Sequence, residues 1–173
     1  MPGAGAIALL VLAVVGLLYG CESEPGSRVA PTGGFGPGDR ARADVIDVVD
    51  GDTIEVSLEG DPERVRYIGV DTPESVAPDQ PVECFGRRAS AANARLVEGE
   101  RVRLVFDREL RDPYGRLLAY VYVGDVLVNA ELVERGLART LEIAPNTAKA
   151  DMFERLEVAA GREARGLWGA CET

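Results

Sequence analysis

The chain has 173 residues, a length that accommodates one domain plus extensions, and its 46% hydrophobic content is normal for a globular core. Its net charge of −10 argues against a broad basic surface for nucleic acid but leaves room for a small cationic site. The chain contains no histidine, so histidine-based catalysis and histidine-ligated zinc are both excluded.

The first segment, residues 1–20, has no charged side chain, and residues 6–19 form a continuous apolar run. A membrane-spanning helix needs about 20 residues, so this shorter run suits the hydrophobic part of an export signal. The positive side chains that usually precede such a run are absent, and a tilted membrane anchor is the alternative. We therefore expect an exported protein with a signal peptide or anchor over residues 1–20.

The end of the apolar run, Leu18-Tyr19-Gly20-Cys21, resembles the lipobox of bacterial lipoproteins, in which cleavage precedes a cysteine that is then lipidated. Leucine, glycine and cysteine match, whereas tyrosine is bulkier than the small residue usual at its place. Lipidation of Cys21 is a hypothesis that makes the protein a cell-envelope lipoprotein, tethered through residues 1–21; otherwise we expect a secreted protein. Glycines and prolines without apolar periodicity predict a flexible linker over residues 21–42.

The composition changes at residue 43, and residues 43–173 are predicted to form one folded domain. Apolar and β-branched residues predict strands over residues 45–49 and 54–58, joined by a tight turn at Asp50-Gly51-Asp52-Thr53. A further strand is predicted over residues 64–70.

This third strand leads directly into a group of charged residues. Alternation places Arg66 on one face of the strand and Asp71 on the other. Pro73 ends the hydrogen-bond ladder because it has no N–H to donate, so Asp71 and Glu74 lie just past the strand end. Two acids beside a strand-borne arginine can hold a metal, accept a proton and grip phosphate. A solvated turn without such a role is the simpler alternative.

The rest of the domain is predicted to contain both strands and helices. Apolar residues at helical spacing predict a helix over residues 84–98, which Gly99 ends. Further strands are predicted over residues 101–106, 117–123, 126–128 and 137–143. Asn129 is predicted to cap a short helix over residues 129–135. A last helix is predicted over residues 148–165, and its inner face is drawn from Met152, Leu156, Val158 or Ala159 and Ala160. This order indicates an α+β fold, a five-stranded barrel of the oligonucleotide-binding (OB) type with about three helices.

Four motifs stand in order along the domain: Asp50-Gly51-Asp52-Thr53, residues 66–74, Asp112-Pro113-Tyr114-Gly115-Arg116, and Gly166-Leu167-Trp168-Gly169. Together they resemble the thermonuclease family, the staphylococcal nuclease-like domains, over residues 45–168. The resemblance implies a calcium-dependent nuclease that hydrolyses phosphodiester bonds of DNA and/or RNA and leaves 3′-phosphates.

By position, the resemblance implies a Ca²⁺ site made by the carboxylates of Asp52 and Asp71 and the backbone carbonyl of Thr72. Calcium prefers hard oxygen ligands, so this set works in a chain without histidine. The alternative for Asp52 is that it only forms the turn before Thr53.

The resemblance also implies catalytic roles for Glu74 as the general base and for Arg66 and Arg116 as phosphate ligands. Two guanidinium groups match the charge that develops on phosphorus with forked hydrogen bonds. Tyr114 is implied to contact a phosphate, with a purely structural role as its alternative. Arg116 has the alternative of only pairing an acid at a hairpin.

The chain departs from the family pattern at three points. The family places an aromatic residue after Gly136-Leu137-Ala138, where residues 139–142 offer none, and often a lysine where Pro113 stands. The chain is also acidic rather than basic. We therefore expect substrate binding that depends on calcium and weakens only gently with salt, because few phosphates are neutralised.

Cys84 and Cys171 remain once Cys21 is assigned to lipidation, and an exported protein is expected to pair such cysteines. We hypothesise a disulfide that ties the predicted helix at residues 84–98 to the C-terminus. Two buried thiols are the alternative.

We expect the protein to be a monomer. Two other functions compete with the nuclease. One is an inactive OB-type module that binds nucleic acid or protein, and the other is an envelope lipoprotein with an acidic binding domain. The intact acids and arginines of the four motifs argue against the inactive module.

Overall fold

The computed structural model describes Met1, residues 34–75 and residues 81–171, and its helices and strands lie in the part of the chain that begins at Pro31. The predicted export signal at residues 1–20, the hypothesis for Cys21 and most of the predicted linker lie outside the described residues and stay predictions. Among the helices that the structure describes, none has the length and apolar character needed to cross a membrane.

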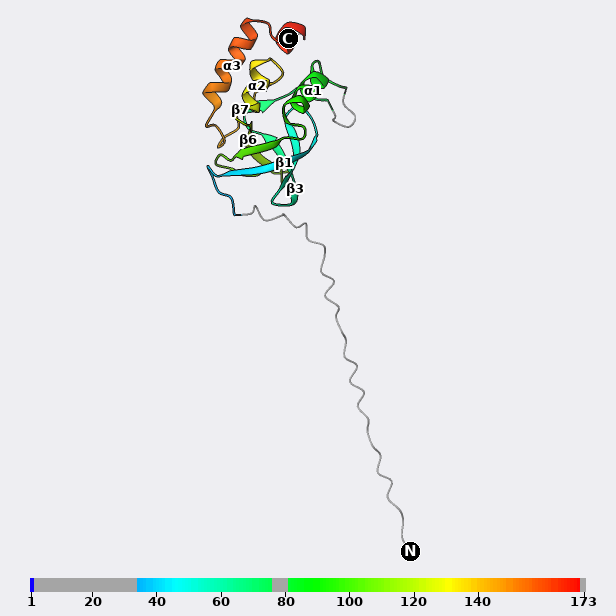
Figure 1. Ribbon diagram of the computed structural model, residues 1–173. Helices are drawn as coiled ribbons and strands as arrows, with labels where there is room; N and C mark the ends of the chain where they lie inside the picture. Colours follow the sequence, from blue (N-terminus) through cyan, green and yellow to red (C-terminus); the bar gives the residue numbers. More distant parts are fainter. Residues whose placement is uncertain (2–33, 76–80, 172–173) are drawn as a thin grey trace. The chain divides into compact units, whose positions relative to one another are not determined.

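Five strands close into a barrel (Figure 1). Strand β1 (Arg40–Val48) lies between β2 (Thr53–Leu58) and β5 (Arg101–Val105) and is antiparallel to both. Strand β3 (Asp61–Tyr67) pairs with β2, and β6 (Leu117–Val123) pairs with β5. A parallel pairing of β3 with β6 closes the ring. The prediction of an OB-type α+β barrel is confirmed.

The remaining elements are β4 (Val70–Asp71), α1 (Gly86–Val97), β7 (Val126–Leu127), α2 (Val128–Glu134), β8 (Arg139–Thr140), α3 (Ala150–Arg162) and α4 (Leu167–Ala170). The helices gather at one end of the barrel, where α2 and α3 pack against each other (Figure 1). Two short strands, β4 and β8, form a separate antiparallel pair, and β7 extends the barrel sheet at β6.

The core is the barrel interior plus the surface that the helices cover. Alternate residues of the strands point inward and are almost inaccessible, among them Ile54, Val56, Val65, Leu104, Leu117 and Val121. Helix α3 contributes Phe153 and Ala160, so the predicted inner face is only partly right: Phe153 is fully buried, whereas Val158 is exposed. The Phe153 ring lies against Gly69, where a Cβ would come within 2.6 Å of it.

The folded part of the chain begins earlier than residue 43. Strand β1 starts at Arg40, and Gly38 donates its N–H to the carbonyl of Phe106 at 3.1 Å. The ring of Phe35 packs on the ring of Phe106, with centroids 5.4 Å apart. An aromatic contact of this kind fixes the last residues of the predicted linker on the barrel.

The strand predicted over residues 64–70 is broken, so the prediction that Arg66 and Asp71 lie on opposite faces was wrong. The chain leaves β3 after Tyr67, turns through Gly69 with a φ of +78°, and enters β4 at Val70. Only glycine adopts this φ without strain. The turn cancels the alternation, so Arg66 and Asp71 lie on the same side and form an ion pair at 2.9 Å.

Two other predicted details differ from the structure. Asn129 does not cap α2; it is fully buried, accepts the Val121 N–H and donates to the Ile68 carbonyl, both at 2.9 Å. The strand predicted over residues 137–143 is reduced to β8, because only Arg139 and Thr140 find a partner strand.

A disulfide joins Cys84, just before α1, to Cys171, just after α4. The two cysteines are 87 residues apart in the sequence, and their Cα atoms are 5.9 Å apart. This is the pairing that the cysteine hypothesis names.

Candidate active site

A polar cleft of about 130 Å³ lies where β2 begins and where β3 and β4 end. The cleft brings together six of the seven residues predicted as catalytic, metal-binding or substrate-binding. It is lined by Asp50, Asp52, Thr53, Arg66, Asp71, Thr72, Pro73, Glu74 and Arg116.

Asp52 connects the turn before β2 to the end of β4. Its Oδ2 accepts hydrogen bonds from the backbone N–H and the hydroxyl of Thr72, at 2.7 and 2.8 Å. The Thr72 side chain packs directly against Gly51, since a Cβ on Gly51 would lie 2.5 Å from the Thr72 hydroxyl oxygen. Asp52 is only 4% exposed, so its orientation is fixed by these contacts.

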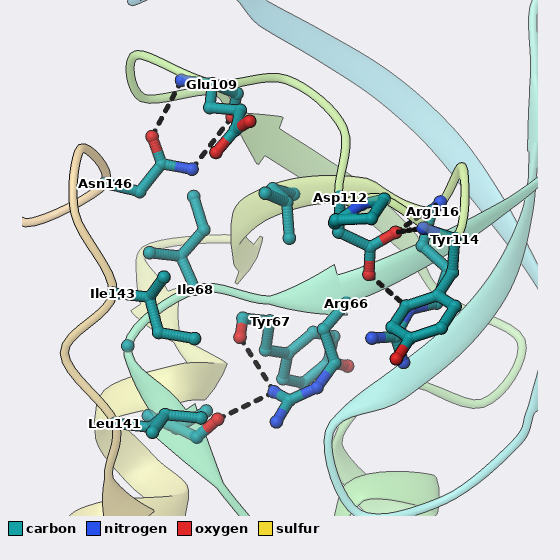
Figure 2. Close-up of a pocket in the computed structure, with 14 residues that line it drawn as sticks. Arg66, Tyr67, Ile68, Glu109, Asp112, Tyr114, Arg116, Leu141, Ile143 and Asn146 are labelled. Carbon is teal, nitrogen blue, oxygen red and sulfur yellow. Dashed lines mark hydrogen bonds and ion pairs between the residues drawn. The ribbon is translucent and has the colours of Figure 1, made fainter.

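Arg66 lies between the two predicted calcium-binding carboxylates. Its Nε is 3.1 Å from Asp52 Oδ1, and its Nη2 is 2.9 Å from Asp71 Oδ1. Its Nη1 donates to the backbone carbonyl of Tyr67 at 2.9 Å (Figure 2) and to that of Val70 at 2.7 Å. The guanidinium is therefore held at the cleft by both charge and main-chain acceptors.

Asp50 is a fourth acid of the cleft, beside Asp52, Asp71 and Glu74, and reasoning from the sequence missed it. Its Oδ1 accepts the backbone N–H of Asp52 at 2.9 Å. Burial, and next the nearby charge of Asp52, raise the pKa of Asp50 above its usual value. The signal was present in the first motif, Asp-Gly-Asp-Thr, in which only the second acid was given a role.

The donor atoms of the cleft fit a hard divalent cation. Asp52, Asp71 and Thr72 offer carboxylate and carbonyl oxygens, the ligands that calcium prefers. The lining includes four acids but only two arginines, and a divalent cation would neutralise this excess of negative charge. In residues 34–75 and 81–171, no three acids or cysteines stand at metal-binding distance; the oxygens of Asp52 and Asp71 converge on Arg66 instead.

Glu74 lies at the same cleft, in the segment that follows β4, and it is half-buried. Its main chain is hydrogen-bonded on both sides to Glu83: the Glu74 N–H donates to Glu83 Oε2 at 3.0 Å, and the Glu74 carbonyl accepts the Glu83 N–H at 2.9 Å. Its Oε1 accepts the Ser75 N–H at 2.7 Å. The carboxylate therefore extends from a backbone that is fixed by the segment before α1.

Arg116 reaches the cleft from the turn before β6. Asp112 holds this turn: its Oδ1 accepts the backbone N–H groups of Tyr114 and Arg116, and its Oδ2 accepts Arg116 Nε at 2.7 Å. Arg116 thus pairs an acid at a hairpin, as its alternative reading stated, and it also lines the acidic cleft.

A second pocket of about 250 Å³ adjoins the acidic cleft (Figure 2). Arg66 and Arg116 line both, so the two guanidinium groups lie at the boundary between them. The second pocket is mainly apolar, with Ile68, Leu118, Leu141 and Ile143 among its lining residues. Tyr114 lines this pocket and not the acidic cleft, and it is 85% exposed. Leu141 and Ile143 occupy the region where the sequence offered no aromatic residue.

Comparisons with known proteins agree with the four motifs. The family model described as "Staphylococcal nuclease homologue" matches residues 64–170. The chain is 44% identical over 121 residues to the thermonuclease of Staphylococcus intermedius, covering 70% of this chain and 72% of that protein. It is 40% identical over 124 residues to the thermonuclease of Staphylococcus hyicus, covering 72% and 73%.

A relative from another genus is the endonuclease YncB of Bacillus subtilis, 43% identical over 122 residues. That alignment covers 69% of this chain and 58% of the relative. The resemblance inferred from the sequence is confirmed. The chain belongs to the staphylococcal nuclease family, and it is a nuclease-type hydrolase.

Proposed function

We propose that this nuclease hydrolyses phosphodiester bonds of DNA and/or RNA in a calcium-dependent reaction that leaves 3′-phosphates. The observation that carries the proposal is the convergence of two arginines and three cleft acids around one polar cavity. The acids are Asp52, Asp71 and Glu74, and the arginines are Arg66 and Arg116.

The cleft residues divide the chemistry between them. Glu74 takes a proton from the attacking water, whose oxygen bonds to phosphorus while the bond from phosphorus to the 5′-oxygen breaks. Arg66 and Arg116 donate hydrogen bonds to the phosphate oxygens, which carry more charge at the transition state. Calcium, held by Asp52, Asp71 and Thr72, would offset phosphate charge and position water. The departing 5′-oxygen takes a proton from solvent water, so the products are a 3′-phosphate and a 5′-hydroxyl.

The apolar pocket beside the arginines supports a nucleotide substrate. A phosphate at the two guanidinium groups places the adjoining nucleoside near Leu118, Leu141 and Ile143. The exposed ring of Tyr114 offers a stacking surface of the kind that binds single-stranded bases without sequence preference.

Plasmid cleavage with calcium and with chelator, comparing the wild type with Glu74→Gln, tests the proposal. We expect wild-type cleavage only with calcium, and a rate lower by about 10²–10⁴-fold in the variant, because a general base contributes that much. Far-UV circular dichroism checks that both proteins are folded. If folded, calcium-loaded wild type binds DNA without cutting it, the inactive binding module is the correct function.

We also propose that the protein is exported and monomeric, with a signal or anchor at residues 1–20 and a linker that leads from residue 21 to a nuclease domain whose first strand starts at Arg40. The apolar run at residues 6–19 supports export, as does a disulfide, which forms in oxidising compartments. Lipidation at Cys21 would give a cell-envelope lipoprotein. Detergent-phase partition of the native protein and of Cys21→Ser separates a lipid tether from a secreted form.

A further inference from the structure

We propose that the Cys84–Cys171 disulfide positions Glu74 for catalysis, acting through residues 83–86. The inference rests on the proposed role of Glu74 as the general base, and it adds Glu83, Gly86 and the disulfide as positioning groups. Three sets of contacts carry it: those between residues 83–86 and the Glu74 backbone, those that hold residues 83–86, and those that hold Cys171.

The Glu74 backbone is held on two sides by residues 83–86. Glu83 accepts the Glu74 N–H with its carboxylate, at 3.0 Å, and donates its own N–H to the Glu74 carbonyl, at 2.9 Å. Gly86 packs against the same carbonyl so closely that a Cβ there would lie 2.3 Å from the oxygen. A displacement of residues 83–86 must therefore move the backbone that bears the Glu74 carboxylate.

Residues 83–86 form a turn in which Gly86 donates its N–H to the Glu83 carbonyl at 3.0 Å, and Phe85 packs partly buried against the core. Helix α1 begins after Phe85, which has a left-handed φ of +72° and gives no side-chain hydrogen bond to the helix start. A non-glycine residue keeps this conformation only where its surroundings impose it. The bond from Cys84 to Cys171 is the covalent constraint at this point, directly between Glu83 and Phe85.

The other end of the disulfide, Cys171, follows α4, which is packed on the rest of the domain. Leu167 of α4 is buried and donates its N–H to the Gly136 carbonyl at 2.8 Å, and Cys171 closes the helix by donating to the Leu167 carbonyl at 3.0 Å. A Cβ on Gly166 would lie 2.2 Å from the Gly136 oxygen, so the two backbones are in direct contact.

Helix α4 is also connected to the predicted calcium site. The guanidinium of Arg139 lies 4.3 Å from the centre of the Trp168 ring in α4, a cation–π contact. Arg139 pairs with Asp71 across β8 and β4. The disulfide therefore ties the segment that holds Glu74 to the helix whose Trp168 contacts the strand partner of Asp71.

Reduction by a dithiol such as dithiothreitol breaks this connection. The disulfide takes up two electrons and two protons and becomes two thiols, while the dithiol becomes a cyclic disulfide. Binding groups stay in place because Arg66 and Arg116 are held by their own acids. We therefore expect kcat to fall and KM to stay within about twofold, since a misplacement near 1 Å costs about 10–100-fold in rate.

The decisive experiment compares oxidised and reduced protein in two backgrounds, wild type and Glu74→Gln, at a temperature where both redox forms are folded. Reduction lowers kcat of the wild type and leaves the residual rate of Glu74→Gln unchanged, because no base remains to be positioned. The fluorescence of Trp168, the only tryptophan, reports whether α4 stays packed. An equal fractional loss in both backgrounds would mean general loosening and would overturn the proposal.

Variants that leave the disulfide intact test the same contacts. Glu83→Ala removes the acceptor for the Glu74 N–H and lowers kcat, whereas Glu83→Gln keeps an oxygen there and restores it. Gly86→Ala pushes on the Glu74 carbonyl and lowers kcat, whereas the matched Gly161→Ala in α3, where a Cβ meets nothing within 4 Å, does not. Equal activity of Glu83→Ala and Glu83→Gln would contradict the proposal.

Failure of the inference and failure of the proposed function are distinguishable. If the wild type cleaves with calcium at the same kcat in its oxidised and reduced forms, only the positioning role of the disulfide is wrong. If the oxidised, folded wild type does not cleave at all, the proposed role of Glu74 is wrong, and the inference fails with it.

Discussion

At the scale of single residues, Asp52 has two tasks in the cleft. One carboxylate oxygen accepts hydrogen bonds from the N–H and the hydroxyl of Thr72, and the other forms an ion pair with Arg66. Both side chains of the ion pair are largely buried, with side-chain exposures of 6% for Asp52 and 13% for Arg66. Without Asp52, the largely buried Arg66 would keep only the more exposed Asp71 as a counter-charge in the cleft, and the loss of a buried partner is costly.

Asp52→Asn should lower the free energy of unfolding by about 3 kcal/mol, because Arg66 loses a buried counter-charge. The same variant should lose the calcium-dependent rise in melting temperature that a metal bound only to the native state produces. Thermal unfolding with calcium and with chelator measures both effects. Asp44→Asn serves as control and should keep the calcium response, because the exposed Asp44 forms its ion pair with the surface residue Arg101. A full calcium response in Asp52→Asn would remove Asp52 from the metal site.

At the scale of elements, a buried amide replaces the predicted helix cap of α2. Asn129 connects the centre of β6 to the turn after β3 through hydrogen bonds with Val121 and Ile68. This turn carries Gly69, whose left-handed conformation brings Arg66 and Asp71 together. The Asn129 amide therefore stabilises the turn that places Arg66 and Asp71 at the cleft.

Asn129→Leu should cost about 2–4 kcal/mol of unfolding free energy, because the Val121 N–H and the Ile68 carbonyl stay buried without their partner. Urea unfolding measures the loss. Glu131→Ala, on the accessible side of the same helix, removes only an ion pair with Arg135 and should cost less than about 1 kcal/mol. Equal losses in both variants would show that Asn129 is not needed as a bridge.

The sequence allowed most strands and helices to be predicted, because their apolar periodicity reports burial directly. It did not show the break at Gly69, since glycine inside an alternating run is also compatible with a continuous strand. Nor did it separate a capping role for Asn129 from a buried one, because both begin at the same position before a helix. Phe153 was missed because the helical stripe chosen for α3 did not include it.

For the site, the motifs predicted which residues meet, and the structure brings Asp52, Arg66, Asp71, Glu74 and Arg116 to one cleft. What each residue does stays a prediction. The apolar pocket beside the cleft could not be predicted, because it combines Leu118 with Leu141 and Ile143, which are far apart in the sequence. Contacts between distant segments depend on the closure of the barrel, which no local pattern encodes.

At the scale of the whole molecule, the disulfide closes a large part of the domain into one covalent loop. Replacing both cysteines by serine should lower the free energy of unfolding by about 4–5 kcal/mol, because the open chain gains conformational entropy when it unfolds. Urea unfolding of oxidised wild type and of the Cys84→Ser, Cys171→Ser variant measures the difference. A loss below about 1 kcal/mol would mean that the unfolded chain is already compact.

The acidic balance of the molecule predicts a weak dependence of substrate binding on salt. With Arg66 and Arg116 as the main phosphate ligands, about two or three phosphates are neutralised, so the slope of log K against log salt for single strands should be about −2. Fluorescence anisotropy of Glu74→Gln with a labelled single strand and calcium, from low to high salt, measures it. A slope near −10 would require a large cationic surface and contradict the prediction.

The position of β1 has a mechanical consequence. Phe35 and Gly38 fasten the start of the domain to Phe106, and the strand that follows is hydrogen-bonded along both edges, to β2 and to β5. A force applied through the N-terminal segment acts along this strand and loads its two ladders in shear, so many bonds must break at once rather than one after another. A nuclease held by that segment would therefore resist being pulled apart by flow or by a moving substrate.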